Sequence, residues 1–148
     1  WLKLRKKIVR MQIKIKRLND ALHMEATNED GVRVHMDGSP EIGGQNLGHR
    51  PMQLVLSALG GCSTIDILDI LKKQRQPVND IDIDVKATRY EDQVPSLFKT
   101  IHLTYTVYGP VDEKKVARAV ELSMKKYCSV AKILEKTAEI TYSYQLKP

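Results

Sequence analysis

Residues 51–74, with the sequence PMQLVLSALGGCSTIDILDILKKQ, predict the long helix around which the rest of the chain is organised. Pro51 suits the first turn of a helix, and only the Gly60–Gly61 pair interrupts the helix-forming residues. The first half is apolar or small all round, whereas the second half alternates apolar and charged residues at helical spacing. We therefore expect a buried central helix, in which the two glycines allow another backbone to approach beside Cys62.

Alternating apolar and polar residues predict strands on both sides of this helix. Three short strands joined by hairpins come before it, followed by a glycine-rich, flexible loop over residues 38–48. Two longer strands, a helix, a short helix and a last strand come after it. In chain order these predicted elements are residues 11–18, 21–27, 32–36, 81–85, 101–107, 112–126, 129–136 and 140–144. The order predicts an α+β fold with mainly antiparallel pairing.

The composition fits one globular domain. The chain has 148 residues, of which 42% are hydrophobic and 28% charged, so collagen-like and disordered classes are excluded. The net charge is +6, but residues 1–10 hold five of the 24 basic residues and no acid. We interpret residues 1–10 as a basic leader, either native or an upstream extension, and residues 11–148 as a single domain.

The remaining charge and hydropathy exclude two classes of partner. Without residues 1–10 the chain is nearly neutral, and no aromatic residues interleave with the leader's lysines, so we expect no nucleic-acid binding. The longest charge-free stretch is residues 51–65, which is shorter than the roughly 20 residues of a membrane-spanning helix. We therefore expect no membrane span and a cytoplasmic protein.

Cys62 and Cys128 are the two cysteines, too few for a disulfide framework. Neither they nor the four histidines show metal-ligand spacing, so we expect no metal, and His35 and His102 fit half-exposed strand faces. The apolar helix around Cys62 favours an inert thiol. Cys128 directly precedes Ser129, the expected cap of a short helix, where backbone N–H groups lower a thiol pKa. On spacing alone, the alternative that both cysteines are small core residues stays open.

Two motifs resemble the OsmC/Ohr family, whose members include thiol-dependent organic hydroperoxide reductases. They are HRPMQLVLSALGGCSTIDIL at residues 49–68 and KKYCSVAKIL at residues 125–134. The similarity extends from about residue 11 to the C-terminus, and it is closest to the little-characterised branch with ALGGCS and KYCSVA. The resemblance implies an OsmC-like intertwined homodimer, in which antiparallel sheets pack around the long central helix.

The resemblance also implies a role for each cysteine. Cys62 takes the place of the peroxidatic cysteine, whose thiolate attacks a hydroperoxide and becomes a sulfenic acid. Cys128 takes the place of the resolving cysteine, which condenses with that sulfenic acid to give a disulfide. An external dithiol then reduces the disulfide, and no bound cofactor or metal is implied.

The chain departs from the hydroperoxide reductases just after the helix-initiating proline. Those enzymes carry a Glu there that anchors an Arg beside the thiolate, whereas this chain has Met52 and then Gln53. Arg33 and Arg50 are the candidates to replace that Arg. Two functions therefore stay open: a thiol-dependent peroxidase acting on organic hydroperoxides, and a non-catalytic dimeric module that binds a small apolar ligand or a protein partner.

Overall fold

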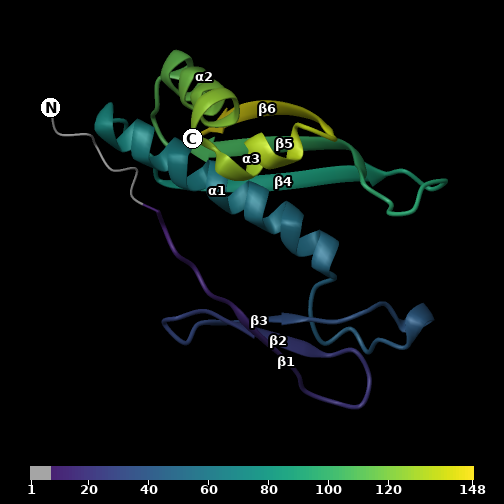
Figure 1. Cartoon of the computed structure of the whole chain (residues 1–148). Coiled ribbons are helices and arrows are strands. Elements are labelled where there is room, and N and C mark those ends of the chain that lie inside the picture. Colours follow the sequence, from purple (N-terminus) through teal and green to yellow (C-terminus); the bar gives the residue numbers. More distant parts are fainter. Residues whose placement is uncertain (1–7) are drawn as a thin grey trace, which may run out of the picture. The chain divides into compact units, whose positions relative to one another are not determined.

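The computed structural model describes residues 8–148 and is shown in Figure 1. Most of the predicted basic leader lies outside these residues. The chain divides into two compact units, residues 1–54 and 55–148, and each is described by itself. Helix α1 (Pro51–Lys73) begins in the first unit and runs through the second, with bounds within a residue of the predicted ones.

The N-terminal unit contains a three-stranded antiparallel sheet in the order β1–β2–β3. The strands are β1 (Lys14–Arg17), β2 (Met24–Thr27) and β3 (Arg33–Met36), each shorter than predicted. Ile15, Ala26 and Val34 lie opposite one another across the three strands, so they share one face of the sheet. Ile15 is 61% exposed and Val34 45% exposed, so this apolar face is largely open.

The glycine-rich loop after β3 is ordered around the buried carboxylate of Asp37, which glycine content alone did not indicate. This carboxylate accepts three backbone N–H groups at 2.7–3.1 Å, those of Gly38, Gln45 and Leu47. Burial by itself raises the pKa of Asp37, but the three donors hold that pKa below its ordinary value. A short 3-10 helix, η1 (Pro40–Ile42), completes the loop.

The C-terminal unit contains a second three-stranded sheet in the order β4–β5–β6. Its strands are β4 (Asp80–Arg89), β5 (Phe98–Tyr108) and β6 (Glu139–Lys147), which confirms the three predicted strands. The β4–β5 pair is antiparallel, as expected. The β5–β6 pair is parallel, because the chain crosses over through the later helices before it enters β6.

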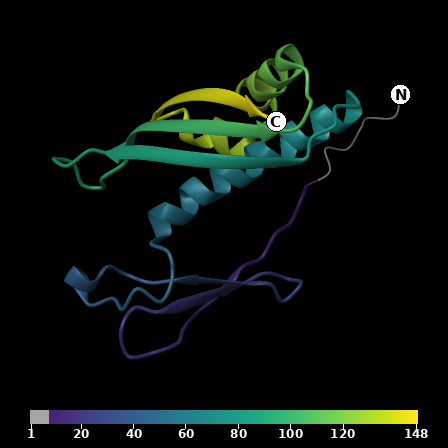
Figure 2. The ribbon, with the colours of Figure 1, turned by 180° about the vertical axis from the view of Figure 1, so that it is seen from behind.

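Three helices cover one face of this second sheet. Figures 1 and 2, which view the molecule from opposite sides, show α1, α2 (Glu113–Leu122) and α3 (Ser129–Leu134) on the same side of it. A five-residue π-helix, η2 (Ser123–Tyr127), continues α2. Asp112 caps α2, as its position predicted, by accepting the backbone N–H of Lys115 at 3.2 Å. The predicted cap of α3 is off by one residue, because Cys128 and not Ser129 is the N-cap.

Helix α1 presents one buried stripe to the core of the C-terminal unit. The stripe has a spacing of four residues and consists of Leu59, Ser63, Ile67 and Leu71. This stripe packs against buried residues of the central strand β5. The hydroxyl of Tyr105 on β5 is hydrogen bonded to Ser63 of the stripe. By length and composition α1 is also long and apolar enough to cross a membrane, which the charge-free stretch of residues 51–65 did not indicate, and 28% of its apolar window is buried in the single chain.

Two expectations about α1 are wrong for the single chain. In the apolar first half only Leu59 and Gly60 are buried, so most of that half is at least partly exposed. A Cβ atom on Gly60 would meet only side-chain atoms of β4, the nearest at 3.4 Å, and one on Gly61 would meet nothing within 4 Å. Within the described residues, no other backbone therefore approaches the glycine pair.

Candidate functional site

The structure brings the two cysteines together, although they lie 66 residues apart in the sequence. The Sγ atoms of Cys62 and Cys128 and a carboxylate oxygen of Asp66 all lie within 4.8 Å of one another. Cys62 is partly exposed, whereas Cys128 is fully buried. Asp66 carries no site motif of its own in the sequence, but it follows Cys62 by one helical turn and therefore lies on the same face of α1.

The backbone positions Cys128 between two helices. The π-helix η2 ends just before it, and its N–H donates to the carbonyl of Ser123 at 2.8 Å. Its Sγ atom in turn accepts the backbone N–H of Ala131 at 3.4 Å, as the N-cap of α3. Single turns of π-helix are frequent at functional sites.

A buried hydrogen-bond network supports the site from the side of the sheet. The hydroxyl of Tyr105 on β5 donates to Ser63 Oγ at 2.6 Å, and Ser63 Oγ donates to the carbonyl of Leu59 at 2.9 Å. Burial raises the pKa of Tyr105 to about 12, so this hydroxyl stays a donor at neutral pH. Ser123 Oγ donates to Asp66 Oδ2 at 3.0 Å and thereby orients the carboxylate.

The electrostatic environment of Cys128 corrects the prediction made from its position at a helix start. Burial raises the pKa of the Cys128 thiol. The hydrogen bond from the N–H of Ala131 lowers this pKa, but its effect is smaller than that of burial. The neighbouring Cys62 and Asp66 raise it further. Desolvation of the thiolate outweighs one backbone donor, because α3 has only six residues and the sulfur has no contact with solvent.

The two candidate cations, Arg33 and Arg50, have partners within the N-terminal unit. Arg33 Nε lies 3.6 Å from a carboxylate oxygen of Glu25. The guanidinium of Arg50 donates to Asn46 Oδ1 at 2.5 Å, and its backbone N–H donates to Gln53 Oε1 at 2.9 Å. Gln53 therefore caps the first turn of α1, and both arginines are engaged by groups other than the two thiols.

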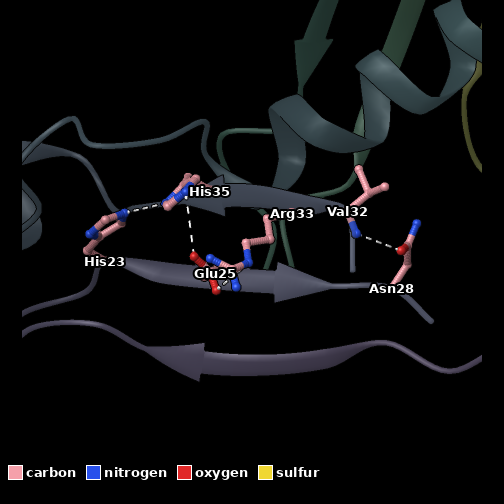
Figure 3. A network of polar contacts seen from close by, with 6 residues as sticks. All are labelled: His23, Glu25, Asn28, Val32, Arg33 and His35. Atoms are coloured by element: carbon pink, nitrogen blue, oxygen red, sulfur yellow. Dashed lines mark hydrogen bonds and ion pairs between the residues drawn. The ribbon is translucent and has the colours of Figure 1, made fainter. Parts of the chain in front are cut away.

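Two histidines of the N-terminal unit form a separate polar cluster, shown in Figure 3. His23 Nε2 and His35 Nδ1 are 2.8 Å apart, and His35 Nε2 lies 3.7 Å from Glu25. His35 is on the half-exposed face that its strand pattern predicted, and its side chain is 45% exposed. His102, on the outer face of the second sheet, contacts two hydroxyl groups, those of Thr141 and Ser143. These contacts join the neighbouring strands β5 and β6.

A pocket of about 360 Å³ adjoins the thiol site through Asp66. Its lining mixes apolar and polar side chains, namely Asp66, Asp69, Ile70, Lys73, Gln74, Leu122 and Tyr127. Lys73 Nζ is held by Asp69 at 2.7 Å. Among the described residues, Gln74 Oε1 is buried and has no hydrogen-bond partner.

Comparison with known proteins relates both units to one family. The family model described as OsmC-like protein matches residues 43–143. Protein YhfA of Escherichia coli (strain K12) is 41% identical over 140 residues, which cover 92% of this chain and 98% of YhfA.

Solved structures share the fold. A hypothetical protein from Aquifex aeolicus VF5 is 29% identical with a TM-score of 0.78, covering 95% of this chain and 100% of that one. An organic hydroperoxide resistance protein OsmC from Legionella pneumophila has a TM-score of 0.70 at 16% identity, covering 94% and 99%. At that identity the likeness is one of fold alone.

Proposed function

The chain belongs to the OsmC-like protein family, and from this membership we propose that it is a thiol-dependent peroxidase that reduces organic hydroperoxides. The observation that carries the proposal is the approach of the Cys62 and Cys128 sulfurs to within 4.8 Å. Thiols at that separation can form a disulfide after small side-chain movements. The choice of a hydroperoxide as the oxidant follows from the resemblance of the two cysteine motifs to the OsmC/Ohr family.

The first step oxidises Cys62, because it is partly exposed and Cys128 is buried. The Cys62 thiolate attacks the terminal oxygen of the hydroperoxide, the O–O bond breaks, and the sulfur becomes a sulfenic acid. The departing alkoxide takes up a proton and leaves as an alcohol. Asp66, whose carboxylate lies within 4.8 Å of the sulfur, would receive the thiol proton through one bridging water and pass it to the alkoxide.

The second step closes the disulfide. The Cys128 sulfur attacks the Cys62 sulfur, the S–O bond breaks, and the Cys128 proton leaves with the hydroxide as water. The raised pKa of Cys128 keeps this thiol protonated, and therefore unreactive toward peroxide, until the sulfenic acid forms beside it. An external dithiol then reduces the disulfide by two exchange steps and is itself oxidised to a disulfide.

The adjoining pocket suits a substrate with an organic group. Ile70 and Leu122 provide apolar surface next to Asp66. Hydrogen peroxide would leave this surface unused. We therefore expect alkyl and aryl hydroperoxides to react faster than hydrogen peroxide.

We also propose that the active form is a homodimer. Large apolar side chains remain exposed on both units, including Ile65 (71%) and Leu68 (38%) of α1 and Ile15 (61%) of β1. Only 28% of the apolar window of α1 is buried in the single chain. Exposed apolar surface of this kind favours association, and a second copy would cover it. Light scattering should give twice the chain mass, and a chain that stays monomeric at high concentration would contradict the dimer.

One alternative function has an observation in its favour. Met52 stands where the hydroperoxide reductases carry the anchoring Glu, and both candidate arginines have other partners. A non-catalytic dimeric module that binds a small apolar ligand needs neither group. It predicts that a chain with both cysteines replaced by serine still binds its ligand.

Steady-state turnover tests the peroxidase. The full chain is mixed with cumene hydroperoxide and excess dithiothreitol, beside Cys62→Ser and the control Asp84→Asn. We expect Cys62→Ser to lose turnover, whereas Asp84→Asn, whose side chain is 65% exposed on β4 and outside the pocket, turns over normally. Cys128→Ser, given one equivalent of peroxide without dithiothreitol, should accumulate a sulfenic acid that dimedone traps. Equal peroxide consumption by Cys62→Ser and the unaltered chain would overturn the proposal.

A further inference from the structure

We propose that Cys62, Asp66 and Cys128 together bind Zn²⁺, and that this binding blocks the thiol chemistry. No metal-ligand spacing is visible in the sequence, because Cys128 comes from a distant part of the chain, between η2 and α3. In the folded chain two sulfurs and one carboxylate oxygen lie within 4.8 Å of one another. In a tetrahedral zinc site, with Zn–S near 2.3 Å and Zn–O near 2.1 Å, such donors are about 3.6–3.8 Å apart. The three side chains therefore need to close by at most about 1 Å.

The donors have the outer support that metal ligands require. Ser123 Oγ holds Asp66 Oδ2 at 3.0 Å, and the N–H of Ala131 points at Cys128 Sγ at 3.4 Å. Such outer contacts fix the direction of a ligand and tune its affinity. Among the ion pairs of residues 8–148, none involves Asp66, so its charge is available to a cation.

The donor set selects the class of metal. Two thiolates with one carboxylate suit a borderline-soft ion such as Zn²⁺, whereas Mg²⁺ and Ca²⁺ prefer oxygen ligands throughout. Three protein ligands leave a fourth position for water. Cys62 and Asp66 are partly exposed, and Asp66 also lines the 360 Å³ pocket, so the ion has a route to the buried Cys128.

Zinc and disulfide formation use the same electron pairs and therefore exclude each other. Binding converts two thiols into two metal-bound thiolates and releases two protons to solvent, with no change of oxidation state. The disulfide form has no thiolate left to donate. Zinc-loaded protein should consequently resist oxidation at both cysteines, and oxidised protein should not bind zinc.

Cobalt(II), which adopts the same tetrahedral site, provides a spectroscopic probe that is independent of peroxidase activity. The reduced full chain is titrated with Co²⁺, and thiolate-to-cobalt absorption in the near ultraviolet reports the sulfur ligands. We expect one Co²⁺ per chain, displaced by Zn²⁺. Asp66→Asn should weaken binding at least about tenfold, whereas Asp69→Asn, one residue of the same pocket but not a donor, should bind as the unaltered chain does.

The unaltered chain in its disulfide form gives a second measurement that needs no substitution and so raises no question of folding. It should show no thiolate-to-cobalt absorption and should regain it after reduction. Equal affinity of Asp66→Asn and Asp69→Asn, persistence of the absorption in Cys62→Ser, or binding by the disulfide form would each overturn the site. A failure of peroxide turnover leaves these results unaffected, so the two proposals are tested separately.

Discussion

Oxidation of Cys62 and Cys128 to a disulfide is expected to stabilise the C-terminal unit by about 4 kcal/mol. The two residues lie 66 positions apart, and both belong to the unit of residues 55–148. The chain-entropy relation for a loop of that length gives about 4.3 kcal/mol at 25 °C. Because the sulfurs already lie within 4.8 Å in the reduced chain, the native structure needs little rearrangement to form the bond.

Thermal unfolding followed by circular dichroism measures this effect. For a unit of this size, about 4 kcal/mol corresponds to a rise of roughly 15–30 °C in the unfolding midpoint before any strain is subtracted. Cys128→Ser treated with the same oxidant is the control and should show no such rise. A chain that carries the disulfide, as verified by mass, yet unfolds at the same temperature as the reduced chain would refute the reasoning.

Three further predictions concern the surroundings of the site and the N-terminal unit. Tyr105→Phe removes the 2.6 Å hydrogen bond to Ser63 and should cost about 1–2 kcal/mol in urea unfolding; no loss would show that the network contributes nothing. Gly61→Ala adds a Cβ that meets nothing within 4 Å, so it should stabilise α1 by up to about 1 kcal/mol, and destabilisation would contradict the open position. Folding lowers the pKa of Asp37. The ionised carboxylate therefore contributes fully to the stability of the fold at pH values above its unfolded pKa of about 3.9, and this contribution disappears as the pH falls through its folded pKa. Asp37→Asn should therefore destabilise the chain at neutral pH and differ little from the unaltered chain in strong acid, and an equal difference at both pH values would contradict this.

Local sequence signals account for most of the secondary structure. The start of α1 follows from Pro51, and its end at Lys73 lies within one residue of the predicted range 51–74. The same kind of signal could not reveal that β6 pairs in parallel with β5, because alternation of apolar and polar residues has the same period in both arrangements. Nor could it reveal the buried carboxylate of Asp37, whose donors come from a loop rather than from a periodic element.

The site was accessible from sequence only in part. The family resemblance predicts Cys62 and Cys128, whereas Asp66 is only a residue one turn along the same predicted helix. Its proximity to Cys128 depends on how α3 packs beside α1, which spacing does not encode. The predicted lowering of the Cys128 pKa is wrong for the same reason, because the sequence indicates a position at a helix start but not the burial that has the larger effect.

The most direct test of the thiol pair is the product of one equivalent of cumene hydroperoxide acting on the reduced chain without any reductant. We predict that the protein loses two hydrogen atoms in mass and that digestion yields a single linked peptide joining Cys62 to Cys128. Two free thiols after the peroxide is added, or a Cys62 that is oxidised while Cys128 stays unlinked, would contradict the account.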